Sequence, residues 1–137
     1  MKKAVAFMLA ASVLLICLSG CSAKPALEDL SQVTRIEIRA HSDTDQTYTD
    51  HVISDKEAVK DLCDTFSSLK LKKVNITKPL EGRYEVRFFK SPDKKAVESF
   101  TVVLSDVIST GSDMYKITSG EDLLEYLSEA VANAADN

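Results

Sequence analysis

An alternating stretch near the amino end of the chain reads Val33-Thr34-Arg35-Ile36-Glu37-Ile38-Arg39-Ala40. Apolar Ile36 and Ile38 take every second position, and charged side chains take the positions between them. Since successive side chains of a strand point to opposite faces of a sheet, this period predicts a strand with one buried face and one open face.

The same alternation returns in residues 83–89, where Tyr84, Val86 and Phe88 form the apolar set. The charged positions of both stretches follow one pattern, Arg-x-Glu-x-Arg, at Arg35, Glu37, Arg39, Arg83, Glu85 and Arg87. All four arginines of the chain lie in these positions, whereas its lysines are scattered. Two strands that carry arginine and glutamate on one face are therefore expected.

Shorter patterns predict the remaining elements. Further strands are expected at residues 47–53, 71–77, 97–104, 107–110 and 114–117. Gly111-Ser112-Asp113 is expected to turn a hairpin between the last two. Ser54 and Glu57 have the spacing of a capping box, and apolar residues at three- and four-residue steps follow them, which predicts a helix. A second helix, capped by Ser119 with Asp122 three residues on, is expected at the carboxyl end.

This order of elements, ββαβββββα, predicts an α+β domain. We expect a single antiparallel sheet with two helices packed on one face. Because the Arg-x-Glu-x-Arg pattern precedes each helix, a duplicated ββα unit is a further hypothesis.

The first 20 residues have the layout of a secretory signal peptide. Lys2 and Lys3 precede an uncharged stretch, residues 4–18. That stretch is shorter than the roughly 18 to 20 apolar residues that a transmembrane helix needs. Two alternatives to a cleaved lipoprotein signal remain open. One is an ordinary signal peptide in which Cys21 is incidental, and the other is an uncleaved membrane anchor.

The signal segment ends in Leu18-Ser19-Gly20-Cys21, which resembles the lipobox of bacterial lipoproteins. The resemblance implies a diacylglyceryl group, with acyl chains such as palmitate, on the thiol of Cys21 and cleavage after Gly20. It also implies a lipid-anchored protein on the extracytoplasmic face of the cell membrane. The remainder is similar to small uncharacterised lipoproteins of Gram-positive bacteria that carry one compact α+β domain, a similarity that implies no activity.

The domain organisation follows from these boundaries. We expect a cleaved signal peptide at 1–20, a lipidated cysteine and short tether at 21–32, one globular domain at 33–134 and a tail at 135–137. The formal net charge is −4, and removal of Lys2 and Lys3 lowers it by two, to −6. An acidic exported protein is not expected to bind nucleic acid.

Residues with catalytic or metal-binding chemistry form no recognisable motif in the sequence. There is no nucleophile elbow, zinc-binding helix motif or phosphate-binding loop, so neither a catalytic residue nor a cofactor is predicted. His41 and His51 stand near several aspartates but lack a ligand spacing, which favours solvated loop residues over a metal site. Cys63 falls on the apolar stripe of the first helix, which favours core packing over a reactive thiol.

The Arg-x-Glu-x-Arg segments are the candidate binding surface. If the helices cover the apolar face, these charges lie together on the open face, where cross-strand ion pairing is the structural explanation. The functional interpretation is that bidentate arginines bind carboxylates or phosphates of an acidic protein or an anionic envelope polymer. The sequence thus predicts a membrane-anchored, non-catalytic binding or protein-interaction module, with a small cell-envelope hydrolase as the alternative.

Overall fold

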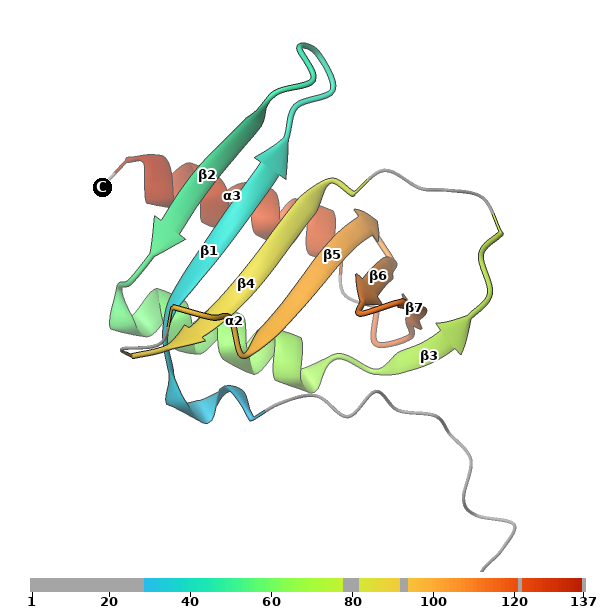
Figure 1. The fold of residues 1–137 in the computed structure, drawn as a ribbon, viewed down its shortest axis with the longest axis horizontal. Helices are drawn as coiled ribbons and strands as arrows, with labels where there is room; N and C mark the ends of the chain where they lie inside the picture. The colour runs from blue at the N-terminus through green and yellow to red at the C-terminus, as the bar shows by residue number, and fades with distance from the viewer. Residues whose placement is uncertain (1–28, 78–81, 92–93, 121, 137) are drawn as a thin grey trace, which may run out of the picture.

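A computed structural model of the chain describes residues 29–77, 82–91, 94–120 and 122–136. It has one antiparallel sheet of seven strands and two helices, which confirms the predicted α+β class and element order (Figure 1). The elements are η1 (Leu30–Gln32), β1 (Val33–His41), β2 (Tyr48–Ile53), α2 (Lys56–Ser68), β3 (Leu71–Val74), β4 (Tyr84–Lys90), β5 (Glu98–Leu104), β6 (Val107–Thr110), β7 (Asp113–Ile117) and α3 (Leu123–Ala135).

The strands follow the order β2-β1-β4-β5-β6-β7-β3 across the sheet. The two Arg-x-Glu-x-Arg segments therefore lie on neighbouring strands, β1 and β4, near the middle of one half of the sheet. Within the part β2-β1-β4-β5, two hairpins meet at the β1–β4 boundary, as a duplicated ββ unit would arrange them. Duplication itself stays a prediction.

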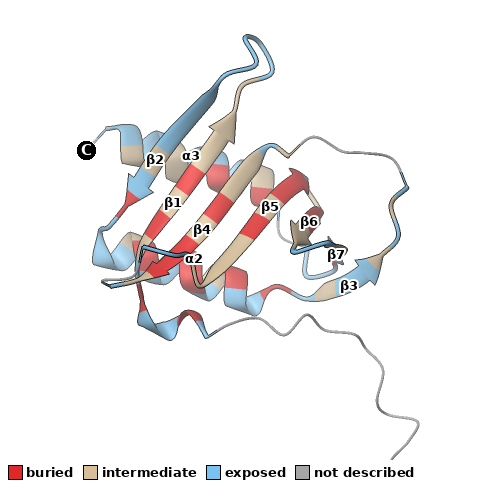
Figure 2. Cartoon of the chain, in the orientation of Figure 1, coloured by how far each residue is buried: buried red, intermediate tan, exposed pale blue. Residues whose placement is uncertain are grey.

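Both helices lie behind the sheet in Figure 1, so they cover one sheet face, and no described helix covers the other, which we call the open face. Figure 2 shows the buried parts of β1, β4 and β5 where the helices cross them. Phe66 of α2 sits at the centre of this core, with its ring centroid 5.3 Å from that of Phe88 and 5.1 Å from that of Phe100. Three aromatic rings from α2, β4 and β5 thus fix the first helix to the sheet.

The helix caps differ from the expected ones. Asp55, not Ser54, caps α2 and accepts a hydrogen bond from the amide of Ala58 at 3.0 Å. Asp122, not Ser119, caps α3. Its Oδ1 accepts hydrogen bonds from the amides of Leu124 at 3.1 Å and Glu125 at 3.2 Å. A carboxylate satisfies free amides as a serine hydroxyl does and also favours the positive end of the helix dipole, so aspartate is the cap in each case.

The β6–β7 hairpin is also tighter than expected. Thr110 pairs with Asp113, which leaves only Gly111 and Ser112 in the loop. Gly111 has φ +60°, a conformation that glycine adopts without a steric penalty and that a two-residue hairpin loop requires at this position.

The folded domain begins earlier than position 33. Leu30 of η1 is buried in the core, and the carboxylate of Asp29 accepts a hydrogen bond from the amide of Ser31. Residues 29–32, which the prediction assigned to the tether, therefore belong to the folded part of the chain. The signal peptide, Cys21 and the rest of that segment lie outside the described residues.

Candidate functional site on the open face of the sheet

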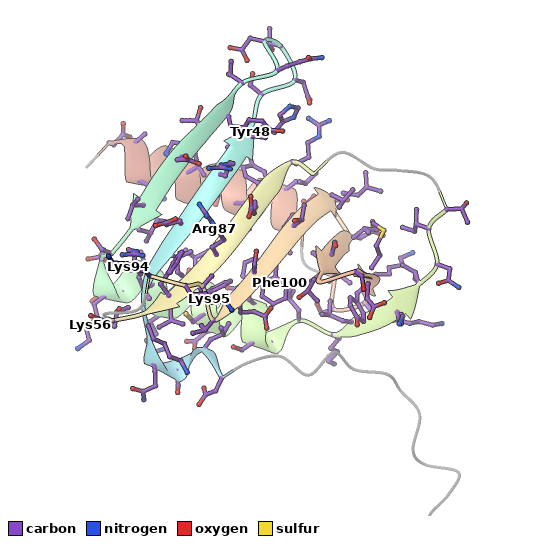
Figure 3. All side chains as sticks on the ribbon, viewed as in Figure 1. Tyr48, Lys56, Arg87, Lys94, Lys95 and Phe100 are labelled. Carbon is purple, nitrogen blue, oxygen red and sulfur yellow. The ribbon has the colours of Figure 1, made fainter. Side chains whose placement is uncertain are left out.

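The structure brings the predicted binding-face residues together. Arg35, Glu37 and Arg39 of β1 alternate with core residues and so point away from the helices, as do Glu85 and Arg87 of β4. Figure 3 shows Arg87 on the side of the sheet opposite the helices.

The pairing of β1 with β4 sets the neighbours on this face. Glu37 lies opposite Arg87, and Arg39 lies opposite Glu85. Arg83 immediately precedes β4, and its carbonyl accepts a hydrogen bond from the amide of His41 at 2.9 Å. All six predicted residues therefore occupy one two-strand strip of the sheet.

Glu37 is the centre of the first ion-pair group. Its Oε2 lies 3.0 Å from Nη2 of Arg87, and its Oε1 lies 3.5 Å from Nε of Arg35. Glu85 lies farther from Arg87, with Oε1 4.0 Å from Nε. The side chains of Arg87 and Glu37 are only 30% and 26% exposed, so this pair is partly shielded from solvent.

A second ion pair links the strip to the edge strand. Arg39 contacts Asp50 of β2 through two nitrogens, with Nε–Oδ1 2.8 Å and Nη2–Oδ2 3.3 Å. The hydrogen bond and charge of Arg39 hold the pKa of the Asp50 carboxyl below its usual value. The hydrogen bond and charge of Asp50 raise the pKa of Arg39 in turn. Arg39 is thus held in the bidentate geometry that arginine forms with carboxylates.

A third group lies at the end of the sheet remote from η1. Arg83 forms an ion pair with Asp43 of the loop between β1 and β2. His41 lies on the same loop side, with Nδ1 3.8 Å from Asp43 and its ring centroid 5.0 Å from that of Tyr48. Tyr48 is 66% exposed and adds an aromatic surface to this end of the face.

Phe89 is an apolar residue on the open face that the alternating pattern of residues 83–89 did not predict. Because Arg35 and Phe89 are cross-strand partners, the guanidinium carbon of Arg35 lies 4.4 Å from the centre of the Phe89 ring. Phe89 is buried yet does not belong to the core cluster beneath the helices. The run Phe88-Phe89 is the sequence signal for it, since consecutive aromatics in a strand must occupy opposite faces.

The ion-paired side chains on the open face balance one another. Each of the four arginines has at least one carboxylate partner, and these partners are Glu37, Glu85, Asp50 and Asp43. The four positive and four negative side chains of this set sum to no net charge. The ion-pair lattice expected as the structural explanation is therefore present, and any partner must match a surface of mixed sign.

Asp50, Tyr48 and Val52 on β2 were missed as members of this face. The sequence contains a strand at 47–53, but its polar and apolar residues do not alternate cleanly. Only the register, which places Asp50 opposite Arg39 and Val52 opposite Glu37, assigns them to the open face.

A groove of about 440 Å³ lies on the other side of the sheet, between β2, α2 and α3. Its apolar lining comes from Ile53, Ala58, Leu62, Ala130 and Ala134, and Val52, whose side chain is on the open face, borders it at the sheet edge. Its acidic lining comes from Asp55, Asp61 and Glu129, and the hydroxyl of Tyr126 donates to Asp61 at 2.8 Å. Of the described residues that line it, none is a lysine, arginine, histidine or cysteine.

Neither histidine supports a metal site. His41 is on the open face, whereas His51 is the partner of core residue Ile38 and so points to the opposite face. Within the described ranges, no group of three or more potential ligands lies close enough to hold a metal ion.

Cys63 is buried among core residues, which confirms its expected packing role. Burial, with a smaller contribution from the charge of Asp64, raises the pKa of its thiol to about 11. The thiol is therefore protonated and poorly nucleophilic at neutral pH.

The predicted lipid anchor cannot be placed on this geometry, because Cys21 precedes the described residues. In the part of the chain that the structure covers, no helix is both long and apolar enough to cross a membrane. Comparison of the chain with protein-family models, curated proteins and solved structures gave no match to any of them.

Proposed function

We propose that this protein is a membrane-anchored, extracytoplasmic binding module that docks another protein on the open face of its sheet. The observation that carries the proposal is the uncovered strip of arginine–carboxylate pairs on β1, β2 and β4. The lipobox-like segment ending in Cys21 supports the anchor, since two acyl chains give stable attachment whereas one gives only marginal attachment.

The balance of charge favours a protein over a polyanion as the partner. An anionic polymer would have to compete with Glu37 and Asp50 for arginines that already have carboxylate partners. A protein surface of mixed sign can instead exchange ion pairs without leaving any of the four carboxylates unpaired. The exposed ring of Tyr48 adds the kind of side chain that is enriched at protein interfaces.

The anchor is tested by Cys21→Ala in the full chain. We expect the variant to lose incorporation of a labelled fatty acid and to leave the membrane fraction. Membrane retention with undiminished labelling would refute the anchor.

The docking face is tested with a photo-crosslinking amino acid in place of Glu85, in intact cells. We expect an adduct with another protein, and we expect Arg39→Gln with Arg87→Gln to reduce its yield. Lys60→Gln is the matched control, because Lys60 pairs with Asp64 on the surface of α2, which lies behind the sheet and not on its open face. Equal yields from the double variant and the control, with folding intact, would refute docking on this face.

The alternative of a small envelope hydrolase stays a prediction. The described residues of the groove offer a hydroxyl–carboxylate pair, Tyr126 and Asp61, but no observation favours this pair as a nucleophile and base.

A further inference from the structure

We propose that the outer edge of β2, which pairs with no other described strand, and the groove beside it bind an extended basic segment of a partner protein that joins the sheet as an eighth strand. This inference rests on the proposed binding function and names where and how one part of the partner is held.

The two edges of the sheet are built differently. The edge strand β3 has four residues, of which Lys72 and Lys73 are lysines, and Lys70 precedes it. Lysines on a short strand are a common means of preventing edge-to-edge pairing. The edge strand β2 has six residues, contains neither lysine nor proline, and pairs with β1 in continuous register from Tyr48 to Ile53. Of the two edge strands in the described part of the chain, β3 carries lysines and β2 does not.

The direction of the backbone groups on β2 follows from two hydrogen bonds. The amide of Ser42 donates to the carbonyl of Thr47 at 3.0 Å, whereas the amide of His41 points to β4 and donates to Arg83. Because backbone groups alternate along a strand, those of residues 49 and 51 point to β1. The N–H and C=O groups of Tyr48, Asp50 and Val52 therefore point outward, toward the position of a further strand.

A strand in that position would contact apolar surface on both of its sides. On the open face, Tyr48 and Val52 are 66% and 59% exposed. On the helix face, the groove presents Ile53, Ala130 and Ala134. Figure 1 shows the carboxyl end of α3 extending past β2, so the helix layer already covers the place where the added strand would lie.

The charge of the groove selects a basic segment. Asp55, Asp61 and Glu129 line it, and none of its described lining residues is a lysine or arginine. Asp50, on the opposite face, is already paired with Arg39, whereas none of the three groove carboxylates forms an ion pair with another described residue within 4.0 Å. A lysine or arginine pointing to that side can lay its aliphatic stem on the alanines and its charged head beside a carboxylate.

The same charges disfavour a second copy of this chain as the occupant. Antiparallel pairing of two β2 strands about a two-fold axis would bring two acidic grooves together. The pairing that centres on Asp50 would also place two aspartates directly opposite each other, and like charges at opposed positions destabilise a sheet.

The proposal is tested in the full, lipid-anchored chain with a photo-crosslinking amino acid in place of Thr49, which lies on the helix side of β2. The adduct is digested, and the partner peptide is identified by mass spectrometry. We expect an adduct with one segment of another protein that contains lysine or arginine, and no adduct from the same residue placed at Lys72 on β3.

Two substitutions separate strand addition from simple proximity. Val52→Pro removes a backbone N–H that points outward and leaves the hydrogen bonds between β2 and β1 in place. We expect it to lower the yield of the adduct from position 49 about tenfold, because proline cannot donate a hydrogen bond to an added strand. Val52→Thr keeps the N–H and is the matched control, with its yield expected within about twofold of the parent chain because threonine also suits a strand.

The charge requirement is tested by Asp61→Asn with Glu129→Gln, which we expect to lower the adduct while Asp64→Asn leaves it unchanged. Asp64 lies on the same helix but pairs with Lys60 and does not line the groove. Circular dichroism and thermal unfolding of each variant confirm folding, so a lost adduct reports on binding.

Each remaining outcome overturns the inference. An adduct with β2 of another copy identifies a homodimer, and a yield that Val52→Pro does not change excludes strand addition. An adduct from position 85 without one from position 49 would support the proposed docking function but refute binding at the edge of β2. Absence of both adducts removes the two proposals together.

Discussion

Substitution of Phe66 by alanine is expected to be the most damaging single change in the domain. Phe66 is 0% exposed and contacts two other buried rings, Phe88 and Phe100. Removing a fully buried phenylalanine costs about 3 to 5 kcal/mol through lost transfer energy and the cavity left behind. Since domains of this size are stable by only about 5 to 15 kcal/mol, we expect Phe66→Ala to lose a large share of the free energy of unfolding.

Urea unfolding of the chain without its signal segment measures this loss, with an unchanged slope as evidence that the native state is otherwise intact. Phe66→Leu keeps most of the buried carbon and should lose less than about half as much. Phe89→Ala is the control on the open face, where the stacked guanidinium of Arg35 can settle into the space. A loss below about 2 kcal/mol for Phe66→Ala would refute the packing of α2 through this ring, because buried phenylalanines cost more than that.

Three further predictions concern individual charged and titrating groups. A double-mutant cycle with Glu37→Gln and Arg87→Gln should give a coupling free energy of about 0.2 to 1 kcal/mol, as is usual for partly exposed ion pairs. A coupling free energy above about 2 kcal/mol would mean that these ion pairs are too stable to be exchanged for contacts with a partner. In an NMR titration, Arg39→Gln should raise the pKa of the Asp50 carboxyl toward that of an ordinary aspartate. Because that pKa is lowered in the folded chain by the hydrogen bond and charge of Arg39, the contribution of Asp50 to stability is present above the pKa of the unfolded chain and is lost as the pH falls through the folded pKa. The Cys63 thiol, with a pKa of about 11, should react with a thiol reagent at pH 8 far more slowly in the native chain than in urea, and equal rates would contradict its burial.

The helices and strands, and the buried side of β1 and of β4, could be predicted because they depend on how apolar residues repeat along a short stretch of sequence. Ile36 and Ile38 are core residues, and the intervening charges are outside the core, as alternation requires. The α2 stripe is likewise buried at Val59, Leu62 and Phe66. These patterns report which side of an element is apolar, and that information is contained within a few neighbouring residues.

The neighbours across the sheet could not be predicted, since they depend on contacts between distant parts of the chain. Glu37 and Arg87 are 50 positions apart and meet only because β4 pairs with β1. Likewise, β3 follows α2 in the chain but lies at the far edge beside β7. The cap of α2 is a smaller example, since the capping-box spacing predicted Ser54 and the structure has Asp55.

The order of the strands also bears on where a membrane-anchored partner would meet this domain. β1 begins directly after η1, and Ile53 at the end of β2 pairs with Ile36 near that beginning. The groove that Ile53 lines is therefore at the end of the sheet next to η1, whereas Asp43 is in the loop at the remote end. From Cys21 to Asp29 there are eight residue steps, which span at most about 26 to 29 Å at roughly 3.3 to 3.6 Å per residue. If Cys21 carries the lipid, a segment that joins β2 comes from a protein that is itself at the membrane surface. A basic stretch next to the membrane-spanning part of such a protein would meet both the reach of the tether and the charge of the groove.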